Sequence, residues 1–423
     1  MRRRRRWRRW FVAAVVVGVA WLVAANIRWP DRGPVQSVAA TPEQLARGRY
    51  LADAADCAAC HTAPGGAPFA GGVALPTPFG TIHGTNITPD PEHGIGRYTA
   101  DDFYRVLTHG EARGGRQLYP AMPYPSYRRI ARADADAIYA YLMTRPATAV
   151  PNPRNGVGFP FNIRTLVNFW NFLYREAESA PASQGQSPAW QRGRYLVDVL
   201  GHCGDCHSPR GTLGQVDPAR ALTGNASLGR VAAPDITPAA LAARGWDARE
   251  LDAYLAGGIA APAAASGEMA TVVALSTSRL AADDRAAMIA YLLGDAPPAA
   301  RVPAVAETDA ALAPGRAHYL DLCAGCHGAQ GQGVPHVAVA LARNSTVQDA
   351  DPHNLIVTIL DGLPEHAYGG VERMQAMPGS ARDLSDADIA ALANWLRVRW
   401  GGQKPTVDAA SVRILRGTAT ASH

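Results

Sequence analysis

The fold of this chain is decided by one five-residue pattern that occurs three times: Cys57-Ala58-Ala59-Cys60-His61, Cys203-Gly204-Asp205-Cys206-His207 and Cys323-Ala324-Gly325-Cys326-His327. The three copies contain all six cysteines of the 423 residues. Two thiols one helical turn apart can both bond the vinyl groups on one edge of a porphyrin, and the histidine that follows can ligate its iron. The sequence therefore predicts three covalently bound haem c groups.

Two other interpretations of the pattern are weaker. A redox-active dithiol seldom has a histidine next to it, and its mechanism does not require three copies with matching flanks. A zinc site would need further cysteines, and the chain has none outside the three pentapeptides. We therefore assign the six cysteines, together with His61, His207 and His327, to haem attachment.

The residues around the pentapeptides repeat as well. A glycine-arginine pair followed by tyrosine and leucine precedes each copy, within residues 48–51, 193–196 and 315–320. An amphipathic segment that begins with acidic residues, as the helix dipole favours, follows each copy at residues 133–144, 282–294 and 385–400. A large ring lies at a matching place in these later segments, at Tyr141, Tyr291 and Trp395. We expect the ring to pack on the glycine of the first helix, so that two helices cross behind each haem.

A methionine follows the histidine of each pentapeptide after 61, 62 and 50 residues, at Met122, Met269 and Met377. A thioether opposite a histidine raises the reduction potential of the iron and closes it to outside ligands. We expect these three methionines to be the sixth ligands. Met374 is a rival to Met377, and ligation by a second histidine at one site stays open.

The predicted fold class is all-α, with three tandem class I cytochrome c domains that carry long loops and follow one N-terminal membrane-anchor or signal helix. Proline-rich stretches mark the boundaries of the units. The predicted segments are the anchor or signal at residues 1–33, domain 1 at 41–150, an aromatic-rich linker at 151–185, domain 2 at 186–297, domain 3 at 308–403 and a C-terminal tail at 404–423.

The N-terminus is predicted to direct export. Seven arginines lie within residues 2–9, and an apolar run extends from residue 10 to residue 25. The positive-inside rule then places the chain beyond residue 30 outside the cytoplasm. We favour an uncleaved anchor over a cleaved signal peptide, because the run is longer than a typical signal core. Without these arginines the net charge of +5 becomes −2, so we expect no nucleic acid partner.

The linker is unusually aromatic, since four of the eight phenylalanines lie between Phe159 and Phe172. Contiguous apolar surface on a protein commonly marks a contact. One hypothesis is that the linker docks onto a partner subunit or the membrane surface. The alternative is that it is buried between domain 1 and domain 2.

Over roughly residues 43–415 the chain resembles the triple-haem cytochrome c subunits of bacterial membrane-bound dehydrogenases for alcohols, gluconate and sorbitol. The resemblance rests on Phe79-Gly80-Thr81-Ile82 with Asn86-Ile87-Thr88-Pro89-Asp90, on residues 118–124 around Met122, on Gly267-Glu268-Met269 and on Trp400-Gly401-Gly402. It implies the axial pairs His61/Met122, His207/Met269 and His327/Met377. Many members of the family look as if they carry a cleaved signal, and the apparent anchor departs from that.

The resemblance also implies partners. In that family a separate catalytic subunit holds a flavin, pyrroloquinoline quinone or a molybdenum cofactor, and electrons pass through the three haems to ubiquinone in the inner membrane, on its periplasmic side. The chain would then be an electron-transfer subunit without catalytic residues of its own. A free-standing membrane cytochrome that donates electrons to a terminal oxidase is the alternative, and a haem enzyme with one open iron is a third hypothesis.

Overall fold

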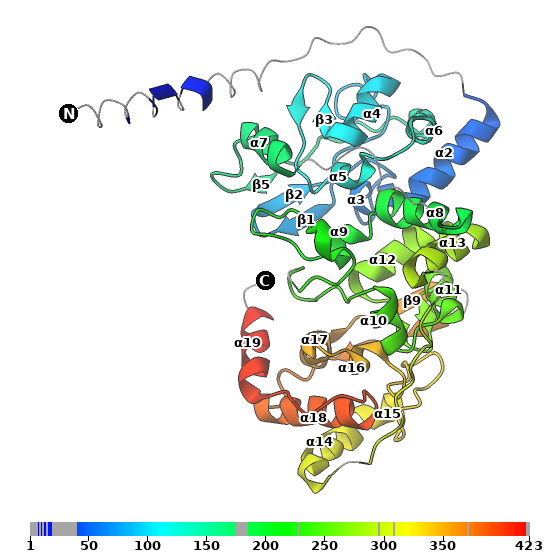
Figure 1. The fold of residues 1–423 in the computed structure, drawn as a ribbon, viewed down its shortest axis with the longest axis vertical. Coiled ribbons are helices and arrows are strands. Elements are labelled where there is room, and N and C mark those ends of the chain that lie inside the picture. The colour runs from blue at the N-terminus through cyan, green and yellow to red at the C-terminus, as the bar shows by residue number, and fades with distance from the viewer. Residues whose placement is uncertain are drawn as a thin grey trace. The chain divides into compact units, whose positions relative to one another are not determined.

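The computed structural model describes residues 40–174 and 185–419, except residues 227, 295–296, 308 and 370–371, together with a few positions between residues 7 and 18. The chain divides into two compact units, Met1–Ala182 and Ser183–His423 (Figure 1). Apart from those few positions, the anchor predicted at residues 1–33 lies outside the described residues. None of the described helices is long and apolar enough to cross a membrane.

The first unit is mainly helical and has small sheets in its loops. Its helices are α2 (Pro42–Ala54), α3 (Cys57–His61), α4 (Ala100–His109), α5 (Tyr124–Tyr127), α6 (Arg132–Met143) and α7 (Thr165–Tyr174). Strands β1 (Ala74–Thr77), β2 (Gly80–His83) and β5 (Gly156–Val157) form an antiparallel sheet, and β3 (Glu111–Ala112) pairs with β4 (Arg116–Gln117).

Local signals set the ends of these helices. Thr41 caps α2 by accepting from the backbone N–H of Gln44, and a proline occupies the first helical position, where its missing N–H costs nothing. Thr99 and Asp102 form a reciprocal capping box at the start of α4, and Gly110 ends that helix with φ 63°.

The second unit contains the other two pentapeptides. Its helices are α8 (Pro188–Arg194), η1 (Tyr195–Leu200), α9 (Gly204–His207), η2 (Pro218–Arg220), α10 (Pro238–Ala243), α11 (Ala248–Gly257), α12 (Gly267–Leu275), η3 (Thr277–Arg279), α13 (Ala282–Leu293), η4 (Ala310–Leu312), α14 (Ala313–His318), η5 (Tyr319–Cys323), α15 (Ala324–His327), α16 (Ser345–Gln348), α17 (His353–Asp361), α18 (Asp386–Arg399) and α19 (Ala409–Ala419). Its strands form two-stranded pairs: β6 (Ile259–Ala260) with β7 (Ala263–Ala264), β8 (Gly362–Leu363) with β11 (Met377–Pro378), and β9 (His366–Gly369) with β10 (Glu372–Met374).

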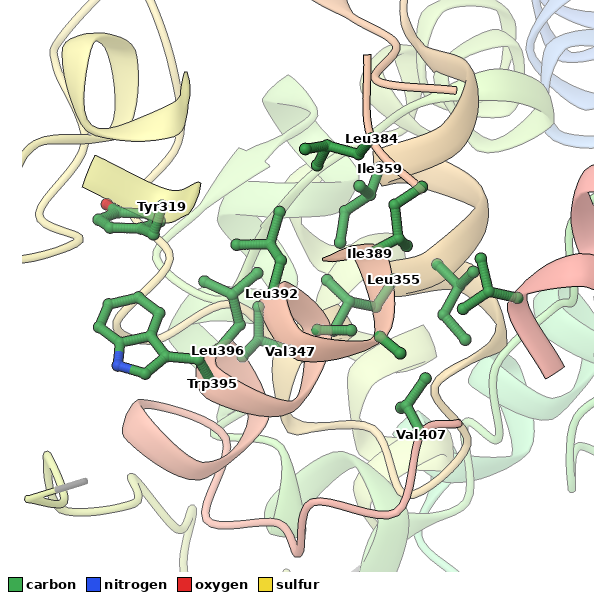
Figure 2. Close-up of a cluster of buried hydrophobic side chains, with 14 of the residues drawn as sticks. Tyr319, Val347, Leu355, Ile359, Leu384, Ile389, Leu392, Trp395, Leu396 and Val407 are labelled. Atoms are coloured by element: carbon green, nitrogen blue, oxygen red, sulfur yellow. The ribbon is translucent and has the colours of Figure 1, made fainter. Parts of the chain in front are cut away.

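A compact apolar core lies in the last part of the second unit. Figure 2 shows side chains from α17 and α18, among them Ile359, Leu392 and Leu396, gathered with Tyr319 of η5. The C-terminal segment, predicted as a tail, contributes to this core, because it forms α19 and its Val412 is fully buried.

The mainly helical character predicted from the sequence is confirmed, and the short sheets are an addition to it. Each strand is only two to four residues long, which is too short to produce a period-two pattern of apolar residues. Below, the residues 41–150, 186–297 and 308–403 are called the first, second and third repeats.

Candidate haem sites

In each repeat the helix before the pentapeptide crosses the closing helix, with no side chain between the two backbones. A Cβ added to Gly48 on α2 would lie 2.0 Å from the carbonyl oxygen of Ala137 on α6. The equivalent distances are 1.8 Å from Gly193 to Ala287 O and 2.1 Å from Gly315 to Ala391 O. Since real Cβ atoms cannot approach an oxygen so closely, only glycine permits this approach.

The ring predicted to brace each crossing lies beside the glycine. The Cβ atoms of Tyr141, Tyr291 and Trp395 are 2.8, 2.9 and 2.8 Å from the position that a glycine Cβ would occupy. In the second repeat the Tyr291 hydroxyl also donates to Asp198 on η1 at 2.9 Å. In the third, the Trp395 ring lies 4.8 Å from that of Tyr319. The crossing thus ties the closing helix to the segment that leads into the pentapeptide.

The histidine ring of each pentapeptide is fixed by a backbone carbonyl. The Nδ1 atom of His61 is 2.5 Å from Thr85 O, that of His207 is 2.8 Å from Pro234 O, and that of His327 is 2.9 Å from Val339 O. A carbonyl can only accept, so Nδ1 carries the proton. The Nε2 lone pair of each ring is therefore the one available to a metal, and the carbonyl sets the ring orientation.

A glycine closes each of these arrangements from the other side. The N–H groups of Gly71, Gly224 and Gly333 donate to the backbone carbonyls of the three histidines, each at 2.8 Å. All three glycines have positive φ, at 78°, 87° and 72°. A Cβ on any of them would lie 2.5 to 2.9 Å from the backbone nitrogen that follows the carbonyl acceptor. The glycine therefore packs against the same peptide group that orients the histidine ring.

Burial keeps the three histidines neutral. Desolvation lowers the pKa of His61, His207 and His327, and the bond to the carbonyl opposes this only in part. Neutral imidazole is the form that ligates iron. At neutral pH the three imidazole rings are therefore in the form that can bind iron.

The cysteines have the character of attachment sites and lack that of a redox dithiol. None of the six is joined to another by a disulfide. Burial raises the pKa of Cys57 and of Cys203 to about 12, and that of Cys323 to about 11, whereas catalytic dithiols lower theirs. No group of three or more His, Cys, Asp or Glu side chains among the described residues is arranged to hold a metal ion directly. Two thiols beside one fixed histidine fit a covalently attached haem.

The three predicted methionine ligands lie on different kinds of element. Met122 is in the loop before α5, Met269 is in the first turn of α12, and Met377 is on the two-residue strand β11. All are half-buried. Met374, the rival to Met377, is also half-buried and pairs with His366 across β9 and β10, so the choice between them remains a prediction.

The carbonyl acceptors are a part of the site that the sequence analysis missed. In the first two repeats a signal was present, because Thr85 precedes Asn86-Ile87-Thr88-Pro89 and Pro234 precedes Asp235-Ile236-Thr237-Pro238. The third repeat has no such sequence around Val339, and its acceptor follows the histidine by only 12 residues.

Comparison with known proteins agrees with this site chemistry. The cytochrome c family profile matches residues 45–146 and 312–400. The fructose dehydrogenase cytochrome subunit of Gluconobacter japonicus is 36% identical to this chain, and the match covers 96% of this chain and 89% of that protein. The chain belongs to the family of dehydrogenase cytochrome c subunits.

Other relatives extend the comparison. The gluconate 2-dehydrogenase cytochrome c subunit of Pantoea cypripedii is 37% identical to this chain. The match covers 88% of this chain and 90% of that protein. A nicotinate dehydrogenase subunit of Pseudomonas putida is 39% identical over 85% of this chain, which spans only 31% of that protein. The fructose and gluconate relatives are cytochrome subunits of their dehydrogenases. The prediction of an electron-transfer subunit, as opposed to an enzyme, is thereby confirmed.

Proposed function

We propose that this subunit relays electrons through three covalent haem c groups, from a dehydrogenase catalytic subunit on the periplasmic side of the inner membrane to ubiquinone. The observation that carries the proposal is the threefold recurrence of one site, with a carbonyl on Nδ1 of the histidine and a positive-φ glycine on its backbone. A site built three times to the same plan indicates three equivalent cofactors.

The residues proposed to hold the cofactors are those of the pentapeptides and the three methionines. Cys57 and Cys60, Cys203 and Cys206, and Cys323 and Cys326 would form the thioether links. His61, His207 and His327 would give Nε2 to the irons, with Met122, Met269 and Met377 opposite. Bound haem c supplies a one-electron iron couple whose potential follows its axial ligands.

Intact mass of the exported protein tests the number of haems. We expect the mass of the polypeptide plus three haems, and the loss of one haem when Cys203 and Cys206 are both replaced by alanine. A mass that shows two haems in the unchanged protein would contradict the proposal, and the three double-cysteine variants would identify the empty site.

Carbon monoxide binding tests the sixth ligands. A methionine-ligated reduced haem resists carbon monoxide, so the unchanged protein should bind little. Met122→Ala, Met269→Ala and Met377→Ala should each open one haem of three, and Met374→Ala is the matched control for the last. If Met374→Ala opens a haem and Met377→Ala does not, the third ligand is Met374.

Purification from native membranes in mild detergent tests the partner. We expect a tag on the C-terminus to recover a dehydrogenase subunit that contains a flavin, pyrroloquinoline quinone or a molybdenum cofactor. The purified complex should then reduce ubiquinone when the substrate of that subunit is added. Recovery of a terminal oxidase instead would favour a free-standing cytochrome.

A further inference from the structure

We infer that Tyr368, which belongs to the third repeat, is a positioning residue for the methionine side of the second haem site. The inference rests on the proposed ligand Met269. Both repeats lie in the second unit of the chain, so their contacts belong to one compact body.

Tyr368 reaches the segment that leads into Met269 by its hydroxyl and by its ring. The hydroxyl donates to the carbonyl of Ala265 at 2.5 Å, four residues before the methionine. The ring lies against Gly258, where a Cβ would stand 2.5 Å from the Tyr368 Cδ1 atom. Gly258 ends α11 with φ 79°. This position favours glycine because the backbone has a positive φ and because the Tyr368 ring leaves no room for a side chain.

The methionine and the tyrosine share one apolar cluster. Ala265, Ala270 and Val273 form its buried centre, and the half-buried side chains of Met269 and Tyr368 pack against it. Removal of the Tyr368 ring would leave a cavity in this cluster, and neighbouring side chains move when such a cavity forms. The neighbour whose movement matters here is the thioether of Met269.

Further bonds from the third repeat hold the same region. The N–H of Ser345 donates to the carbonyl of Pro262, in the turn between β6 and β7, at 2.7 Å. Arg244 on the second repeat pairs with Asp349 on the third at 2.9 Å, and its side chain is largely buried. Ser345 and Tyr368 of the third repeat thus both bond to the segment from Pro262 to Ala265, which leads into α12.

The first haem site has a comparable brace from outside its own repeat. Arg164, just before α7, donates to the carbonyl of Gln117 at 2.9 Å and stacks on the Tyr119 ring, 3.9 Å from its centre. Tyr124, two residues after Met122, donates to Asn171 on α7 at 2.7 Å. In both sites a segment from outside the repeat contacts the residues next to the proposed methionine ligand.

Such a brace affects the potential of the haem, because groups around an axial ligand set its position and the polarity of its surroundings. The test is therefore made on the full chain with all haems attached. Potentials are measured by spectroelectrochemistry, carbon monoxide binding is measured on the reduced protein, and the far-red absorption of methionine-ligated ferric haem is recorded.

We expect Tyr368→Ala to change one haem of three: its potential falls, its far-red absorption weakens, and its reduced form binds carbon monoxide. Tyr368→Phe keeps the ring and loses the bond to Ala265, and should shift the same potential without opening the iron. Arg373 is exposed on β10, which pairs with the strand of Tyr368. Arg373→Ala is therefore the matched control and should leave all three potentials and carbon monoxide binding unchanged.

Met269→Ala supplies the reference for a lost second ligand. If Met269→Ala leaves carbon monoxide binding unchanged, the proposed ligand is wrong, and the error lies in the proposed function. If Met269→Ala opens one haem while Tyr368→Ala and Tyr368→Phe leave all three potentials unchanged, the inference about Tyr368 is overturned. Should Tyr368→Ala lose haem altogether, the shift in Tyr368→Phe decides.

Discussion

Gly193 on α8 and Ala287 on α13 touch through their backbones, because a Cβ on the glycine would lie 1.8 Å from the alanine carbonyl oxygen. Gly193→Ala should therefore force the two helices apart. Overpacking against a rigid backbone costs about 3 kcal/mol, so we expect a loss of this size in the free energy of unfolding and less haem retained in the second repeat. Denaturant unfolding and the haem-to-protein ratio measure both effects.

Gly257→Ala is the control for this substitution. Gly257 also lies in a helix, and a Cβ there meets nothing within 4 Å. Alanine at that position should be neutral or stabilise the helix by up to about 1 kcal/mol. Equal destabilisation by the two variants would show that the crossing is not the cause.

Gly224→Ala should disturb the orientation of His207. The positive φ of 87° costs a non-glycine residue about 1–2 kcal/mol, and the new Cβ would stand 2.9 Å from the backbone nitrogen of Asp235. The carbonyl of Pro234, which belongs to the same peptide group, would shift away from the His207 ring. We expect the potential of one haem to change, as measured by spectroelectrochemistry.

Gly229 provides the control that separates backbone strain from movement of the Pro234 carbonyl. Its φ is also 87°, and nothing lies within 4 Å of its Cβ position. Gly229→Ala should lower stability through strain alone and leave all potentials unchanged. A potential shift in both variants would remove the link between Gly224 and His207.

Acid should release α19 from the core. Arg416 donates to Asp386 at 2.7 Å, and this bond holds the pKa of Asp386 below its usual value. The folded state then binds a proton less readily than the unfolded state, so the contribution is complete above about pH 4 and is lost as the pH falls further. Amide exchange in α19 should accelerate in that range.

Asp386→Asn should make exchange in α19 fast already at neutral pH and remove the acid dependence that comes from this pair. Its exposed neighbour Asp383 provides the control, because Asp383→Asn should leave the exchange profile as it was. If the acid-induced release persists in Asp386→Asn, other carboxylates hold the helix.

We predict that the aromatic linker docks onto the proposed catalytic subunit. Phe159 and Phe172 are 81% and 73% exposed, whereas Val167 on the same helix as Phe172 is buried. Replacement of both phenylalanines by serine should lower the affinity for the partner by roughly a hundredfold or more, since burial of each such side chain is worth roughly 1.5–3 kcal/mol. Haem content should stay unchanged.

Val167→Ser provides the contrast, because it should weaken the first unit itself and lower its haem content. Full recovery of the partner with the double serine variant would contradict docking at these two residues. The alternative hypothesis, that the linker is buried between domain 1 and domain 2, would then be favoured.

The repeats themselves could be predicted from sequence because their signals are local. A glycine-arginine pair, a pentapeptide and a ring on the closing helix recur with nearly constant spacing, and the crossing of Gly48 with Ala137 follows from them. The helix ends could be predicted for the same reason, as Ser385 and Asp388 show with their capping box.

The contacts between repeats could not be predicted. Tyr368 lies in a short hairpin of the third repeat and meets Ala265, which is 103 residues earlier in the chain. Nothing in a single sequence reports such a pair, because the ring and the carbonyl carry no spacing rule. The role of the Val339 carbonyl could not be predicted either, since every residue has a backbone oxygen and none is marked by its side chain.

The helix crossings also constrain how such a chain can diversify. The three copies differ in the bracing ring, with tyrosine in two and tryptophan in the third, yet each has a glycine facing a backbone oxygen. A ring can be exchanged for another of similar shape, whereas every mutation that replaces glycine adds a Cβ where there is no room. If the three repeats arose by duplication, Gly48, Gly193 and Gly315 would be among the last shared residues to be replaced.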